Sequence, residues 1–219
     1  MSSRPAKVKI LVVDDHPLVR QGLSMRIEME PDWEVCGEAA GVDDALSLAA
    51  QTNPDLMLID ISLKGGHGID LVKQVKSRHP VIKMLVISGF QESLYAERAL
   101  RAGALGYINK QDSNEKLISA IQTVLAGQRF VSPETQQRLL DQALSGREMV
   151  KSPEEQLSDR ELEIFHLIGE GVTSGAIANQ LMLSTHTIDS HRESIKRKLG
   201  LKNVGELTRA AVQWVLENG

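Results

Sequence analysis

Short apolar runs recur at regular intervals along the first half of the chain. Each run is short and rich in valine, isoleucine, leucine or methionine, which predicts buried β-strands. The predicted strands cover residues 7–13, 33–39, 56–60, 83–87 and 106–109. The third run, Leu56–Ile59, stops abruptly on a carboxylate, Asp60, and opens into a glycine-rich loop.

Segments with apolar residues three and four positions apart separate these runs and predict helices. The helices begin at Pro17, about Asp43, Ile69, Glu92 and about Ser113, and the last ends near Ala126. In the first helix the predicted apolar side consists of Leu18, Val19, Leu23, Met25 and Ile27. Such regular alternation predicts an α/β fold: a doubly wound, five-stranded parallel sheet with helices on both faces.

The pattern changes after residue 129. Residues 130–155 form a predicted linker, with one helix from Ser132-Pro133 to about Leu144 and a flexible connector from 145 to 155. Residues 156–219 have helical spacing throughout. They begin with a capping box, Ser158 and Glu161, and contain two helices joined by a brief turn before Ser184. We therefore predict a first domain at 1–129 and a second, all-α helix-turn-helix domain at 156–219.

Composition excludes several classes of protein. Hydrophobic residues make up 42% of the chain and charged residues 25%, and no apolar run approaches the roughly 18 residues of a membrane span. No secretory segment is visible, and the single cysteine, Cys36, excludes an internal disulfide. We expect a cytoplasmic protein without a membrane partner. The net charge of −4 argues against coating of nucleic acid by bulk electrostatics and leaves a local basic patch possible.

Polar residues stand where four of the predicted strands end. These residues are Asp14 and Asp15, Asp60, Ser88 and Lys110. The carboxyl ends of parallel strands meet at one edge of the sheet, so their side chains are expected to share a pocket. Three carboxylates repel one another and suit Mg²⁺, whereas zinc favours His or Cys. The hydroxyl and the ammonium suit a phosphoryl group, with Asp60 as its nucleophile. Taken alone, Asp60 could also be a helix cap or a loop charge.

Four motifs carry a resemblance to a known family. They are VVDDH at 12–16, LIDISL at 58–63, VISG at 86–89 and GYINK at 106–110. With them the first domain resembles the flavodoxin-like receiver domain of two-component response regulators. The whole chain resembles the NarL/FixJ subfamily, whose second domain is a LuxR-type helix-turn-helix.

The resemblance implies a role for each residue of the pocket. Asp60 would be the phosphoacceptor, and Mg²⁺ would be held by Asp14, Asp15, Asp60 and the Ser62 backbone carbonyl. Ser88 and Lys110 would contact the phosphoryl group, and Ser88 and Tyr107 would act as the switch. Two positions depart from the family, because Lys64 and Gln111 stand where proline is frequent.

The predicted recognition helix runs from Ser184 to Leu199. Ile188, Ile195 and Leu199 form its inner stripe, and the opposite face is polar. Its candidate DNA contacts are Thr185, Thr187, Asp189, Ser190, Arg192, Glu193, Lys196, Arg197 and Lys198. Positive charge concentrates between residues 192 and 202, which favours phosphate contacts. Asp189 and Glu193, however, stand where relatives often have basic residues, and Gly175-Ala176 replaces a frequent Lys-Glu.

The expected function is phosphorylation-dependent control of transcription. A sensor histidine kinase or a small phosphodonor would phosphorylate Asp60, and a homodimer would bind double-stranded DNA. The final helix, with Val204, Leu207, Ala211 and Val215, is the expected dimer contact. The chain would be no classical enzyme, with at most self-catalysed phosphoryl transfer and autodephosphorylation. Two alternatives remain: a Mg²⁺-dependent aspartyl phosphatase, which would want an acid where Ser62 stands, and a regulator that works by protein contacts alone.

Overall fold

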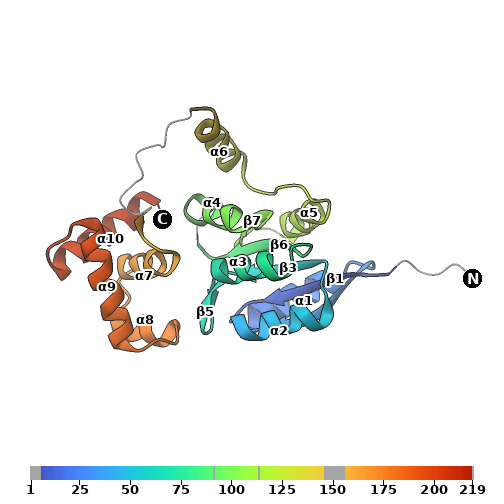
Figure 1. Cartoon of the computed structure of the whole chain (residues 1–219), viewed down its shortest axis with the longest axis horizontal. Helices are drawn as coiled ribbons and strands as arrows, with labels where there is room; N and C mark the ends of the chain where they lie inside the picture. The colour runs from blue at the N-terminus through green and yellow to red at the C-terminus, as the bar shows by residue number, and fades with distance from the viewer. Residues whose placement is uncertain (1–5, 91, 113, 146–155, 219) are drawn as a thin grey trace, which may run out of the picture. The chain divides into compact units, whose positions relative to one another are not determined.

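The computed structural model describes residues 6–90, 92–112, 114–145 and 156–218 (Figure 1). Its contacts divide the chain into two compact units, with the division between Gln136 and Gln137. The predicted connector at 145–155 lies outside the described residues except for Ser145. None of the helices within the described ranges has both the length and the apolar character needed to cross a bilayer.

A five-stranded parallel sheet forms the centre of the first unit. Its strands are β1 (Val8–Val13), β2 (Trp33–Ala39), β3 (Leu56–Asp60), β6 (Lys83–Ser88) and β7 (Gly106–Asn109). They lie in the order β2-β1-β3-β6-β7, and every neighbouring pair is parallel. The order reverses after β1, which places helices on both faces. The predicted doubly wound sheet is confirmed.

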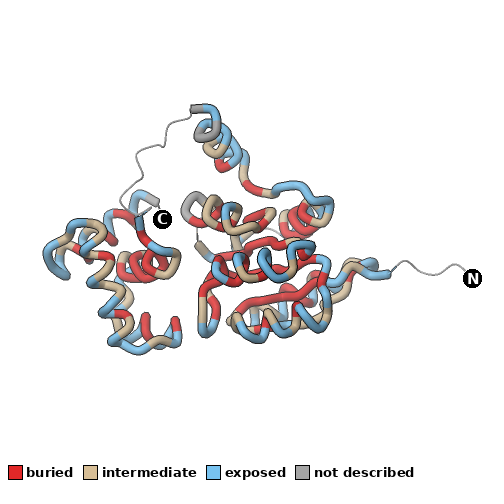
Figure 2. The backbone as a smooth tube through the Cα atoms, viewed as in Figure 1, coloured by how far each residue is buried: buried red, intermediate tan, exposed pale blue. Residues whose placement is uncertain are grey.

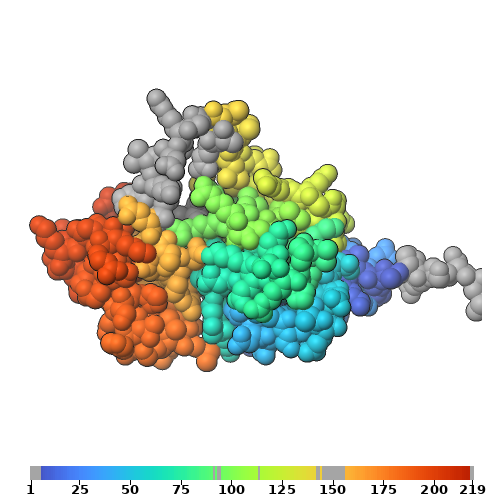
Figure 3. Space-filling model, in the orientation of Figure 1, coloured from blue at the N-terminus to red at the C-terminus, as the bar shows by residue number. Residues whose placement is uncertain are grey.

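Helices cover both faces of this sheet. They are α1 (Pro17–Glu28), α2 (Val42–Thr52), α3 (Gly68–Arg78), α4 (Glu92–Ala102) and α5 (Asn114–Leu125). Alternate strand residues such as Ile10, Leu58 and Ile87 pack with α1 and α5 in one apolar cluster. Residues between them are buried as well, so the central strands β3 and β6 are buried along almost their whole length (Figure 2). On the other face α2 and α3 are in contact, and their surfaces lie side by side in Figure 3.

The loop after Asp60 contains a small hairpin that the sequence pattern did not predict. Strands β4 (Ser62–Leu63) and β5 (Gly66–His67) pair antiparallel, and the turn between them has Gly65 at φ +72°. Gly68 then begins α3 against the backbone of Asp60, because a Cβ there would lie 2.0 Å from the Asp60 carbonyl oxygen. This close approach fixes the backbone that carries Asp60.

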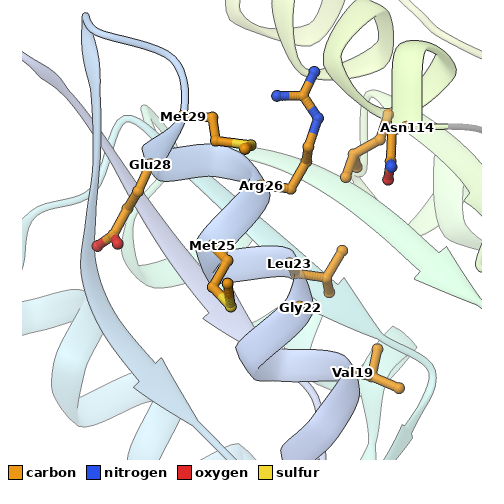
Figure 4. A pocket seen from close by; sticks show the side chains of 9 residues that line it. Val19, Gly22, Leu23, Met25, Arg26, Glu28, Met29 and Asn114 are labelled. Atoms are coloured by element: carbon orange, nitrogen blue, oxygen red, sulfur yellow. The ribbon is translucent and has the colours of Figure 1, made fainter.

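The prediction for the buried side of α1 was wrong at two positions. Leu18 is 83% exposed and Met25 is 63% exposed, whereas Leu23 and Ile27 are buried. Leu23 and Ile27 lie one turn apart on the inner face, and Leu18 and Met25 are seven residues apart on an outer stripe. Met25 lines a surface groove of about 700 Å³ between α1 and the start of α5 (Figure 4).

The second unit is helical. Its helices are most of α6 (Pro133–Ser145), followed by α7 (Asp159–Gly169), α8 (Ser174–Gln180), α9 (Thr185–Leu199) and α10 (Val204–Asn218). Side chains cap three of them: the predicted capping box of Ser158 and Glu161 begins α7, Thr173 caps α8, and Ser184 caps α9. Gly200, at φ +67°, ends α9. A helix is present as α6 where one was predicted between Ser132 and about Leu144, and the helix-turn-helix pattern of α8 and α9 is confirmed.

Helix α10 packs its inner face on α7. A Cβ at Gly169 would lie 2.4 Å from the backbone oxygen of Ala211, so the two helices approach closely here. Leu207 and Ala211 are completely buried within the unit. These two residues were predicted as dimer contacts, and that assignment was wrong because they fill the core of their own unit. The exposed apolar residues of α10 are Val204, Val212 and Leu216.

Candidate functional site

The structure brings the strand-end residues together at one edge of the sheet. Asp14 directly follows β1, Asp60 ends β3 and Ser88 ends β6. Lys110 directly follows β7, and its backbone N–H donates to the Ser88 carbonyl at 2.8 Å. The parallel register therefore carries four chemical groups, spread over nearly a hundred residues, to adjacent strand ends.

Lys110 connects the two buried carboxylates of this pocket. Its Nζ lies 2.6 Å from Asp14 Oδ2 and 2.8 Å from Asp60 Oδ2. Asp14 is fully buried and Asp60 is 2% exposed. The other oxygen of Asp60, Oδ1, accepts a hydrogen bond from the Ile61 N–H at 2.8 Å. Both oxygens of Asp60 are thus held, which fixes the orientation of its carboxylate.

Asp15 and His16 complete the cluster on its more open side. His16 Nδ1 lies 2.7 Å from Asp15 Oδ1 and 3.5 Å from Asp14 Oδ1. Together with Asp60, these residues offer four ligand atoms that all lie within 4.8 Å of one another. Sequence reasoning missed His16, although it directly follows the acid pair in the VVDDH motif.

The pocket holds more negative charge than its single ammonium offsets. Burial raises the pKa of Asp60 to about 7, although the charge of Lys110 opposes the shift. Burial also raises the pKa of Asp15. Burial alone would lower the pKa of Lys110, but the charges of Asp60 and Asp14 and the hydrogen bonds to both carboxylates together raise it. Buried carboxylate oxygens at this spacing fit a hard divalent cation such as Mg²⁺.

Ser88 and Tyr107 both contact the loop that follows β6. Ser88 Oγ accepts from the Phe90 N–H at 3.1 Å, and the Tyr107 hydroxyl donates to the Phe90 carbonyl at 2.7 Å. Tyr107 is 1% exposed, so its ring lies inside the unit, and burial raises the pKa of its hydroxyl. Ser62 lies in β4, half-buried and paired with His67.

Two further residues support the pocket, and sequence reasoning missed both roles. Arg20, one helical turn after His16, donates from Nη1 to the Asp14 backbone oxygen at 2.6 Å, and its Nε lies 3.1 Å from Glu38 Oε2. Helical spacing from the acid pair was the signal that could have found it. The charge of Lys64 acts on Asp15 and lowers its pKa, which opposes the larger effect of burial.

The predicted recognition helix, α9, presents a polar outer face. Of the predicted DNA contacts, Thr185, Asp189, Ser190, Glu193 and Arg197 are exposed, and Thr187, Arg192, Lys196 and Lys198 are half-buried. Ile188 and Ile195 are fully buried and hold the helix on its unit. The predicted division into an inner apolar and an outer polar face is therefore confirmed.

Several basic residues of α9 have partners inside the unit. Lys198 Nζ lies 2.5 Å from Glu161 Oε2, Lys196 pairs with Glu193 at 2.8 Å, and Arg192 donates to Ser174. Burial would raise the pKa of Glu161, but hydrogen bonds from Lys198 and Ser158 lower it to about 2. The ammonium of Lys198 thus stabilises the start of α7. Arg197, by contrast, is exposed on the outer face of α9.

Comparison with known proteins agrees with this arrangement. A family model of the response regulator receiver domain matches residues 10–122, and one of bacterial regulatory proteins of the luxR family matches residues 155–211. The response regulator GacA of Pseudomonas aeruginosa is 34% identical over 206 residues, which cover 94% of this chain and 96% of GacA. The chain belongs to the two-component response regulators of NarL/FixJ type.

Further relatives support the same membership. The oxygen regulatory protein NreC of Staphylococcus carnosus is 33% identical over 211 residues, covering 94% of this response regulator and 97% of NreC. The response regulator RcsB of Salmonella typhimurium superposes with a TM-score of 0.65 at 26% identity, over 95% of this chain and 98% of RcsB. Another RcsB structure, bound to the rprA promoter with the phosphomimetic BeF3⁻, has a TM-score of 0.61 at 26% identity, over 93% and 97%.

Family membership assigns the general roles of the two units. A receiver domain implies a sensor kinase as partner, and a LuxR-type helix-turn-helix implies DNA binding. Receiver domains generally bind Mg²⁺ at an acidic pocket, and this response regulator has an acidic cluster of Asp14, Asp15 and Asp60. It is a transcription regulator and no classical enzyme.

Proposed function

We propose that this response regulator is switched by phosphorylation of Asp60. The donor is the phosphohistidine of a sensor histidine kinase or a small phosphodonor. An Asp60 carboxylate oxygen forms the new O–P bond while the N–P bond of the phosphohistidine breaks and its electron pair stays on the imidazole. Later attack by water returns the carboxylate and inorganic phosphate. The proposal rests on the convergence of Asp14, Asp60 and Lys110 within direct contact distance.

Mg²⁺ would be held by Asp14, Asp15, Asp60 and the Ser62 carbonyl. When bound, it neutralises negative charge on the carboxylates and on the incoming phosphoryl oxygens. Asp60 must be ionised to attack, but burial raises its pKa to about 7. A cation bound beside it would lower this pKa and so favour the ionised, reactive form. Lys110 and Ser88 then offer an ammonium and a hydroxyl to the phosphoryl oxygens.

Phosphorylation would act on DNA binding through Ser88 and Tyr107. Both side chains are hydrogen-bonded to Phe90, so a phosphoryl group that engages Ser88 changes the loop that also holds Tyr107. The outcome is a population shift that favours a homodimer with α9 in the major groove of DNA. A shift from 1:99 to 99:1 needs about 5.5 kcal/mol of preference for the active state.

Phosphate incorporation tests the acceptor directly. Purified full-length protein is incubated with labelled acetyl phosphate and Mg²⁺, and covalent label is counted. Asp60→Asn should abolish incorporation because the amide is no nucleophile. Asp70→Asn is the matched control, since Asp70 is an exposed carboxylate on α3 that pairs with Lys73. Label retained by Asp60→Asn would overturn the assignment.

A regulator that works without phosphate is the second candidate. Its support is the exposed acidic pair on α9, Asp189 and Glu193, which repels DNA phosphates. Gel shifts with and without a phosphodonor separate the two readings. A tighter complex on phosphorylation supports the proposed switch, and equal affinity in both states supports the alternative.

A further inference from the structure

His16 lies against the acid pair of the pocket in a position suited to metal binding. Its Nδ1 is 2.7 Å from Asp15 Oδ1 and 3.5 Å from Asp14 Oδ1. Ligand atoms around a tetrahedral zinc ion, at bond lengths of about 2.0 Å, are about 3.3 Å apart. Both distances from Nδ1 lie within about 0.6 Å of this value, all three atoms lie within 4.8 Å of one another, and they belong to consecutive residues at one turn.

The side chain of His16 contacts the acid pair but does not cap the helix that follows it. It occupies the N-cap position of α1, but it makes no side-chain capping bond. The side chain is 61% exposed, so it can turn toward an ion without leaving a core. The helix start is instead held by Pro17 and by the bond from His16 N–H to Asp14 Oδ1 at 2.8 Å.

The donor set decides which ions would use this imidazole. Carboxylate and carbonyl oxygens suit Mg²⁺, whereas imidazole nitrogen suits zinc, cobalt and nickel among the divalent ions. Mg²⁺ gains little from a nitrogen ligand. A borderline transition ion instead gains a nitrogen ligand that is already in contact with the two carboxylates.

We propose that His16 is an additional ligand for transition metal ions of the Zn²⁺ and Co²⁺ class, so that the receiver pocket distinguishes them from Mg²⁺. Asp14 and Asp15 bind either ion, and His16 joins them only for the transition ion. The ion that occupies the pocket would then depend on the relative concentrations of the two kinds of divalent cation. This inference rests on the proposed metal site and adds a selectivity determinant to it.

Metal affinities of three full-length proteins test the inference. Wild type, His16→Ala and His186→Ala are titrated with Mg²⁺ and with Zn²⁺ alone by calorimetry at about pH 8, where an ordinary imidazole is neutral. His186, exposed at the start of α9, controls for adventitious binding to surface histidines. His16→Ala should weaken the Zn²⁺ affinity about tenfold or more and change the Mg²⁺ affinity less than twofold, whereas His186→Ala should change neither at the pocket.

A spectroscopic readout separates ligation from a general electrostatic effect. Zn²⁺ should shift the Nδ1 resonance of ¹⁵N-labelled His16, and Mg²⁺ should not. An unchanged Zn²⁺ to Mg²⁺ affinity ratio in His16→Ala, or an unshifted Nδ1 resonance, overturns the inference. Asp60 labelling with Mg²⁺ is measured on the same samples. If it succeeds while the ratio is unchanged, only the role of His16 fails; if wild type takes no label, the proposed function fails.

Discussion

Lys110 occupies the space between two buried carboxylates, where a divalent cation would place its own charge. Its ammonium lies within 2.8 Å of both Asp14 and Asp60. Lys110 and Mg²⁺ therefore compete for the same negative charge when no phosphoryl group is present. In the proposed phosphorylated state, additional oxygens would be available and we expect the two cations to act together.

Removal of this ammonium should separate metal binding from phosphoryl transfer. We expect Lys110→Met to bind Mg²⁺ several-fold more tightly, because the carboxylates lose their internal cation, and to accept phosphate more slowly, because the phosphoryl oxygens lose a partner. Calorimetry gives the first quantity and labelling from acetyl phosphate the second. Lys116→Met, which breaks an i,i+4 pair with Asp112, is the control. Weaker Mg²⁺ binding in Lys110→Met than in this control would contradict the competition.

The lowered pKa of Glu161 predicts that the second unit loses stability as the pH falls. Its folded-state pKa is about 2, below the ordinary value of 4.5, so the unfolded chain takes up this proton first as the pH falls. The stabilisation is complete above about pH 4.5 and is lost toward pH 2. Glu161→Gln should lower stability by about 1–2 kcal/mol at neutral pH and flatten the loss between pH 4.5 and 2.

The two tryptophans allow this loss to be measured in the correct unit. Trp33 lies in the first unit and Trp214 in the second, so a Trp33→Phe background leaves the Trp214 signal. Urea unfolding is followed by fluorescence at each pH. The control is Glu206→Gln, because Glu206 caps α10 with Asn203 on the surface and has no ammonium of this kind. An equally steep acid loss in Glu161→Gln would contradict the assignment.

At the scale of elements, α1 holds the turn that carries the acid pair. Arg20 donates to the Asp14 carbonyl, and Glu38 of β2 accepts from both Arg20 and Ser24. This links α1, β2 and the end of β1 through one guanidinium. The network fixes a backbone position without contacting the metal-binding oxygens themselves.

The loss of this link should weaken the metal site without unfolding the sheet. Arg20→Ala is expected to lower Mg²⁺ affinity by about tenfold, as removal of an outer partner of a ligand does in other metal sites. Arg26→Ala is a matched control on the same helix, since Arg26 pairs with Glu30 away from the pocket. Calorimetry measures affinity, and circular dichroism checks the fold. Equal Mg²⁺ affinities in the two variants would leave Arg20 with a purely structural role.

The element pattern shows what the sequence could and could not predict. The strands were predictable because buried parallel strands are continuous apolar runs, and the pocket followed because their ends share one edge. The hairpin β4–β5 was not, because strands of two residues have no periodicity. The pair of Lys198 with Glu161 joins residues 37 positions apart, so no local pattern announces it. Helical spacing also predicted that Leu18 and Met25 are buried, but the core contacts only the neighbouring stripe of α1, which carries Leu23 and Ile27.

At the scale of the whole molecule, each unit has its own core and its own task. The first contains the acidic pocket and the second contains α9 with its polar outer face. Several basic residues of α9 are engaged within the unit, and Asp189 and Glu193 add negative charge to the exposed face. Part of the positive charge of α9 is therefore engaged within its own unit, and we expect two protomers to bind together over paired half-sites.

The outer ridge of α10 is the surface that we expect to join those protomers. Val212 and Leu216 are four residues apart, so they lie on the same side of the helix, and they are 38% and 80% exposed. Val204, at the start of the helix, is 51% exposed. Val212→Glu should lower DNA affinity on a paired half-site about tenfold while the urea midpoint of the second unit stays unchanged, because the residue is outside the core. Gln213→Glu adds the same charge beside the ridge and is the control. Gel shifts on DNA with one and with two half-sites measure the effect. A loss of affinity confined to the paired site supports the ridge as the dimer contact. An equal loss on a single half-site would show that the cause is charge repulsion from DNA and not a broken dimer.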